Sequence, residues 1–198
     1  MTRAVGPGSA EMPELPRREP YRTWLGSAVV FAVIVLLVGA LVVVDSNTSG
    51  AEEVAPGTTV DVGKGVTFVP ADGWSLVREN TTPGSEAAVA AQGGSFSVQV
   101  KEWDDSLDAE VERTRRTIDA NSLRVIGDGA PFRTEGGLTG TRLGYTGPTT
   151  QGSAWVAVDD AADLAVVVFA SSVPETAQRV SGPFDEMTNS IRMTGAGA

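Results

Sequence analysis

The segment from Leu164 to Ala170, LAVVVFA, is apolar at every position. A strand with one face in solvent alternates apolar and polar side chains, whereas a strand covered on both faces is apolar throughout. We therefore predict a central strand here, with another layer of the molecule packed against each of its faces.

Short β-branched runs broken by Gly, Pro and Asp predict further strands joined by turns. They cover residues 59–62, 66–70, 75–77, 87–92, 95–101, 123–126, 131–133, 138–145 and 154–158. In 95–101, apolar and polar residues alternate, which predicts one buried and one solvent-exposed face. Gly93-Gly94 predicts a two-residue hairpin turn between 87–92 and 95–101.

Two helices are expected around these strands. Apolar residues recur at spacings of four, three and four from Leu107 to Ile118, which predicts an amphipathic helix near 106–120 with a solvated charged face. A second helix begins near Pro174 and is expected to break at Gly182-Pro183. The predicted fold class is α+β, an antiparallel β-sheet packed with helices.

The order of these elements resembles the PsbP-like fold. The resemblance rests on Val66-Thr67-Phe68-Val69-Pro70, on Gly73-Trp74, and on the final helix ending at 189–191, and it covers residues 58–194. That family includes photosystem lumenal subunits and the LpqN-type lipoproteins of actinobacterial envelopes. It implies a largely non-enzymatic module that docks on membrane complexes, proteins or envelope lipids, with Gly73 and Trp74 as fold determinants. Unlike the lipoprotein members, this chain has no cysteine to acylate.

The segment Trp24 to Val44, WLGSAVVFAVIVLLVGALVVV, contains 21 consecutive uncharged residues. As a helix it would span about 32 Å, the thickness of a bilayer's hydrocarbon core. We predict a single transmembrane helix over 23–44, between a disordered cytoplasmic tail at 1–22 and a linker at 45–57. The domain at 58–194 would then lie outside the cell membrane.

The orientation follows from charge. Arg17, Arg18 and Arg22 precede the apolar segment, and no basic residue follows it until Lys64. Positive residues resist translocation, so the N-terminus is expected in the cytoplasm, with Trp24 at the headgroup level. The alternative is a signal peptide cleaved near Ser49-Gly50-Ala51, but the apolar segment is longer than a signal-peptide core.

Composition excludes several classes of function. The chain has no Cys and no His, which removes cysteine nucleophiles, disulfides, Cys/His zinc sites and Ser-His-Asp triads. Residues 58–194 hold 19 acidic and 11 basic residues, a net charge of −8, so nucleic acid is an unfavourable partner. Arg outnumbers Lys thirteen to two, a bias typical of GC-rich bacterial genomes. No cofactor or metal is expected.

Trp103 is the leading candidate for an exposed binding contact, because it follows a strand edge and precedes a loop. Tyr145, before Gly147-Pro148, is the second candidate. Exposed aromatic residues are enriched at interfaces, although packing in the core is their commoner role.

Carboxylates offer alternative chemistry. Asp159, Asp160 and Asp163 could supply oxygen ligands to calcium, but an Asp-rich hairpin turn explains them better. Asp104 and Asp105 could form an acid/base pair, although helix capping is the simpler role. Glu102 beside Trp103 could belong to a carbohydrate site.

The sequence therefore predicts a membrane-anchored, non-catalytic binding or accessory module of a bacterial envelope, which docks on a protein complex or a lipid. A carboxylate-dependent envelope hydrolase and a structural envelope component are the alternatives.

Overall fold

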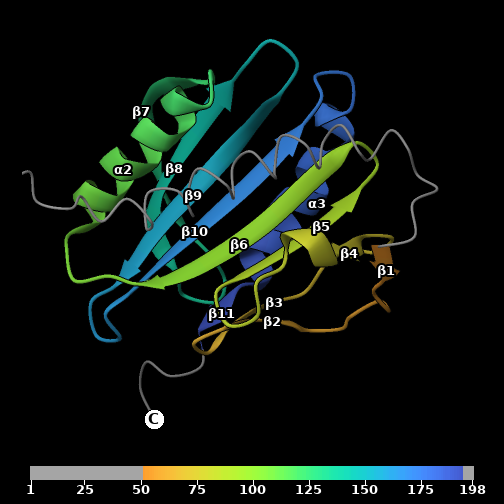
Figure 1. Ribbon diagram of the computed structural model, residues 1–198, viewed down its shortest axis with the longest axis horizontal. Coiled ribbons are helices and arrows are strands. Elements are labelled where there is room, and N and C mark those ends of the chain that lie inside the picture. The colour runs from red at the N-terminus through yellow and green to blue at the C-terminus, as the bar shows by residue number, and fades with distance from the viewer. Residues whose placement is uncertain (1–50, 194–198) are drawn as a thin grey trace, which may run out of the picture.

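A computed structural model of the chain describes residues 51–193 (Figure 1). The predicted tail, the predicted membrane helix and its flanking residues Arg17, Arg18, Arg22 and Trp24 lie outside the described residues. No helix within 51–193 is both long and apolar enough to cross a membrane.

The described chain forms an eight-stranded antiparallel sheet, a three-stranded sheet and two α-helices (Figure 1). The large sheet has the order β1-β4-β5-β6-β10-β9-β8-β7, and the small sheet has the order β11-β3-β2. The large-sheet strands are β1 (Ala51–Glu53), β4 (Ser75–Val77), β5 (Glu86–Ala91), β6 (Gly94–Glu102), β7 (Arg124–Arg133), β8 (Thr139–Thr146), β9 (Gln151–Asp159) and β10 (Leu164–Ser172). The small-sheet strands are β2 (Val60–Gly63), β3 (Val66–Phe68) and β11 (Arg192–Met193).

Strand β10 confirms the predicted central strand. It lies between β6 and β9, and all nine of its residues are buried. Val166 and Val168 belong to one hydrophobic cluster, whereas Val167 and Phe169 belong to another. Because successive side chains of a strand point to opposite faces, this one strand contributes to a core on each side of the sheet.

The two helices cover opposite faces. Helix α2 (Leu107–Ala120) packs on β7, β8 and β9, as predicted for 106–120, and it places Ile118 in the cluster with Val167 and Phe169. Helix α3 (Ala177–Ser190) lies on the other face of the large sheet, beside the small sheet (Figure 1).

The predicted break at Gly182-Pro183 is wrong, because α3 runs through both residues. A residue before proline avoids the helical region when its Cβ meets the proline ring. Gly182 has no Cβ, so the helix continues, and Phe184 and Met187 fill the core beyond it.

The hairpin turn between β5 and β6 also differs from the prediction. Ala91 pairs with Gly94, so the turn consists of Gln92 and Gly93, whose φ angles are 53° and 79°. Positive φ at both positions is typical of a type I′ turn. Gly94 belongs to the strand, where a Cβ would lie 3.1 Å from the Phe184 ring.

The face of β6 predicted to be exposed is partly buried. Ser95 and Ser97 are 6% and 1% exposed. The cross-strand partners of Ser97 are Ala88 and Phe169, so a small serine is flanked by a large ring on this face. The alternation of apolar and polar residues within β6 cannot predict that a side chain from a strand distant in sequence covers this face.

The small sheet was not predicted as a separate layer. It packs beside α3 in a core that contains Phe68, Trp74, Phe96 and Phe184. Trp74 is 1% exposed and meets Phe184 at a ring-centroid distance of 5.6 Å, consistent with its predicted role as a fold determinant.

The predicted linker extends less far than expected. Residues Ala51–Glu53 form β1, which pairs with β4 in the register Ala51↔Val77 to Glu53↔Ser75. The chain therefore joins the large sheet before the predicted linker ends at residue 57.

Candidate functional site

A groove of about 780 Å³ lies at one end of the large sheet, where the β6–α2 loop and the β9–β10 turn meet the edge strand β7 and its neighbour β8. Its apolar lining comes from four elements: Trp103 in the loop, Leu107 at the start of α2, Phe132 in β7 and Val158 in β9. Four aspartates also line it: Asp104, Asp105, Asp160 and Asp163.

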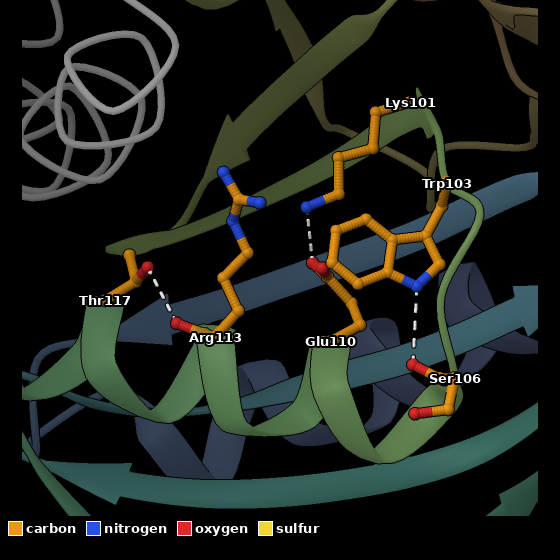
Figure 2. Close-up of polar contacts among 6 residues, drawn as sticks. All are labelled: Lys101, Trp103, Ser106, Glu110, Arg113 and Thr117. Atoms are coloured by element: carbon orange, nitrogen blue, oxygen red, sulfur yellow. Dashed lines mark hydrogen bonds and ion pairs between the residues drawn. The ribbon is translucent and has the colours of Figure 1, made fainter. Parts of the chain in front are cut away.

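Main-chain pairing fixes the position of Trp103. Its backbone N–H donates to the Asp163 carbonyl at 2.8 Å, which extends the β6–β10 ladder by one residue. Its indole Nε1–H donates to the Ser106 carbonyl at 3.3 Å (Figure 2). The ring is half-buried. The sequence-predicted Trp103 thus lines the groove, and its role in binding stays a prediction.

An ion pair lies beside the Trp103 ring. The Lys101 ammonium donates to Oε1 of Glu110 at 2.5 Å and lies 4.8 Å from the indole centroid (Figure 2). The Arg113 guanidinium lies 5.6 Å from the same centroid. Cations over an indole face are attracted by its quadrupole. Two basic side chains therefore hold the ring in place.

The ion pair is unequally exposed. The Glu110 side chain is 2% exposed and that of Lys101 is 32% exposed. Burial holds the pKa of the Lys101 ammonium below its usual value, and the hydrogen bond and charge of Glu110 partly oppose that shift. Oε2 of Glu110 is buried and lacks a hydrogen-bond partner among the described residues.

The acid/base alternative for Asp104 and Asp105 has no support in this geometry. Oδ1 of Asp105 accepts from the Ser106 N–H at 2.7 Å, and Oγ of Ser106 accepts from the Ala109 N–H at 3.2 Å. Ser106 is the N-cap residue of α2, as the capping role predicts for this segment. Both aspartates are exposed.

The Asp-rich turn between β9 and β10 orders its own backbone. Oδ1 of Asp159 accepts from the N–H groups of Ala161 and Ala162 at 2.9 and 3.2 Å, as Asp does in many turns. Residues 51–193 contain no group of three or more acidic, His or Cys side chains arranged to hold a metal ion. The calcium alternative therefore has no support in this part of the chain.

The predicted exposure of Tyr145 is wrong. Its side chain is 3% exposed, and its hydroxyl donates to the Ala170 carbonyl at 3.0 Å. The ring lies over Gly152, where a Cβ would come within 2.6 Å of the hydroxyl. Burial raises the pKa of Tyr145 to about 12, although a hydrogen bond with Ser171 opposes the shift.

Glu102, considered for a carbohydrate site, does not line the groove. It is paired with Lys64 at 2.7 Å, and its side chain is 84% exposed. The hydrogen bond and charge of Lys64 lower the Glu102 pKa.

Sequence reasoning missed the groove and the Lys101–Glu110 pair. The charged face of helix α2 was predicted to be solvated, and Glu110 was not singled out. The sequence did contain a signal for the burial of Glu110. Glu110, Thr114 and Ile118 are spaced four residues apart, on one side of the helix, and all three are buried. The partner strand could not be inferred from that spacing.

The structure has an α+β fold of the PsbP-like class. The solution structure of cyanobacterial PsbP (CyanoP) from Synechocystis sp. PCC 6803 matches 75% of this chain and 98% of its own length, with a TM-score of 0.52 and 18% identity. The crystal structure of LpqN, involved in cell envelope biogenesis of Mycobacterium tuberculosis, matches 74% of this chain and 90% of its own length. Its TM-score is 0.49 and its identity is 13%.

The sequence itself matches no family model and no curated protein. The predicted PsbP-like fold is thus confirmed by structure, at identities that establish the fold alone.

Proposed function

We propose that this chain is a single-pass membrane protein whose extracytoplasmic domain is a non-catalytic binding or accessory module of a bacterial envelope. The observation that carries the proposal is the half-buried Trp103 ring on the wall of a groove of about 780 Å³. Ligand sites are commonly concave, of this size, and lined by aromatic side chains with a few polar groups.

The proposed mechanism is tethering. The apolar segment 23–44 holds the domain at the outer surface of the membrane, where the local concentration of a membrane-bound partner is high. A groove with modest intrinsic affinity then suffices for stable association. The partner is an envelope protein complex or, as the alternative, an envelope lipid.

The experiment is proximity cross-linking of the intact protein in its native membrane, followed by mass spectrometry. We expect enrichment of one membrane complex relative to a control that retains only residues 1–50. We also expect Trp103→Ala to reduce this enrichment, whereas Ile126→Ala, at an exposed apolar residue of β7, leaves it unchanged. Recovery of the bait alone would contradict the protein-partner proposal.

The hydrolase alternative makes a different prediction. It requires two carboxylates in the groove to act on a cell-wall glycan or lipid, so Asp160→Asn or Asp104→Asn should abolish turnover. We expect the full-length protein to release no product from purified envelope glycan or lipid. Turnover that depends on either aspartate would replace the binding proposal by an enzymatic one.

A further inference from the structure

We propose that the groove binds an extended basic segment of a partner protein, with Lys or Arg side chains laid against its apolar lining. The inference rests on the proposed binding function and gives the chemistry of the partner.

The charge of the groove is unbalanced. The carboxylates of Asp104, Asp160 and Asp163 are exposed and make no hydrogen bond or ion pair within residues 51–193. No Lys or Arg is among the groove's lining residues. A partly enclosed surface with one sign of charge attracts ligands of the opposite sign and repels those of the same sign.

The groove also has an apolar lining, in addition to these carboxylates. Trp103, Leu107, Phe132 and Val158 are all half-buried, so each presents part of its apolar surface to the groove. Lys and Arg side chains place their aliphatic stems on apolar surface while the charged group stays in water. A basic peptide matches both the apolar lining and the acidic rim.

Two cations beside the Trp103 ring are already engaged. Lys101 is neutralised by Glu110 at 2.5 Å. Arg113 is held against the indole of Trp103, with its guanidinium 5.6 Å from the ring centroid. These two side chains already occupy the indole as cation partners, so an incoming cation is directed to the rim carboxylates.

The volume of the groove favours a segment over a single amine. The groove of about 780 Å³ extends from the β6–α2 loop to Pro131 and Phe132 of β7 and to Asp160 in the β9–β10 turn. Pockets of this size enclose ligands much larger than one side chain. A short extended peptide can contact all three borders at once.

The experiment measures peptide binding to the full-length protein in neutral detergent micelles, by calorimetry. The probe is a capped peptide of sequence KVKVKVK, compared with EVEVEVE and QVQVQVQ. We expect the basic peptide alone to bind, with an affinity that falls as salt is added.

Matched variants locate the binding site. Asp160→Asn/Asp163→Asn removes two groove charges, and Asn tolerates the φ of 51° at position 163. Asp185→Asn/Glu186→Gln removes two exposed charges from α3, outside the groove. We expect the first pair to weaken binding about tenfold or more, the second pair to change it less than about twofold, and Trp103→Ala to weaken it about tenfold.

Three outcomes would overturn the inference. They are equal binding of KVKVKVK and QVQVQVQ, equal loss in both double variants, and equally tight groove binding of free spermidine. Each leaves the cross-linking result of the proposed function intact. Conversely, a bait that cross-links only to itself would refute the protein partner even if the peptide bound.

Discussion

The Lys101 ammonium lies 2.5 Å from Oε1 of Glu110, and this contact joins the end of β6 to the first turn of α2. One member of the pair is buried and the other reaches solvent. Removing the Lys101 ammonium is therefore expected to destabilise the fold more than removing the Glu110 charge.

We expect Lys101→Met to lower the free energy of unfolding by about 2–4 kcal/mol, because it leaves the buried Glu110 carboxylate without its cation. Glu110→Gln should cost less, about 1–2 kcal/mol, since the Lys101 ammonium can extend into water. Urea denaturation measures both values. The double variant Lys101→Met/Glu110→Leu should be less destabilised than the sum of the single variants; simple additivity would argue against energetic coupling.

We expect Gly94→Ala to lower the free energy of unfolding by about 1–3 kcal/mol through overpacking. A Cβ at this position would lie 3.1 Å from Phe184 and 3.2 Å from both Trp74 and Val180. Gly144→Ala is the control, because its Cβ would meet only Ile126, at 3.8 Å. Thermal or urea denaturation of the two variants gives the comparison, and equal stabilities would contradict the packing described for Gly94.

We expect Tyr145→Phe to lower the free energy of unfolding by about 1–2 kcal/mol, since Ala170 loses its side-chain donor in a buried site. The folded-state pKa of Tyr145 is raised from 10.0 to about 12. Its contribution to stability is therefore present below about pH 10 and lost as the pH rises through about 12.

Absorbance titration of tyrosinate checks this value. The chain has two tyrosines, so the difference between the parent protein and Tyr145→Phe isolates Tyr145. Ionisation of Tyr145 near pH 10 in the folded protein would contradict its burial.

Glu86 gives a pH-dependent prediction at the acidic end. Burial raises its pKa above 4.5, and a hydrogen bond from Gln99 opposes the shift. A raised folded-state pKa contributes stability that is complete below pH 4.5 and is lost as the pH rises through the folded-state value.

We therefore expect Glu86→Gln to stabilise the protein more at pH 7 than at pH 4, as measured by urea denaturation at the two pH values. Glu135→Gln, at an exposed turn residue, is the control for the loss of one negative charge. The same gain at both pH values in the Glu86 variant would argue against the burial of this carboxylate.

The periodicity of the sequence predicts individual strands and helices well, but it does not predict contacts between residues that are distant in the chain. The apolar run at Leu164 predicts a central strand because both of its faces are covered, and the stripe from Leu107 to Ile118 predicts α2 because one face is covered. These signals lie within the elements themselves. The Gln92–Gly93 turn was missed because Gly94 is required for packing by Phe184, ninety residues away.

The same contrast between local signals and distant contacts holds for the candidate site. Trp103 was identified from its position between a strand and a loop, and it lines the groove. Tyr145 occupied a similar position but is buried, because Gly152 on the neighbouring strand leaves room for its ring. The groove itself is lined by four strands and helices and by two loops that are distant in sequence, so no single stretch of sequence could reveal it.

The pairing of Ala51 with Val77 limits how far the proposed binding module can reach. Only residues 45–50 separate the predicted membrane segment from the first paired residue. Six extended residues span at most about 20 Å, which is less than the diameter of a small domain. An anchored domain would therefore stay close to the membrane, which favours partners that are themselves bound to that membrane.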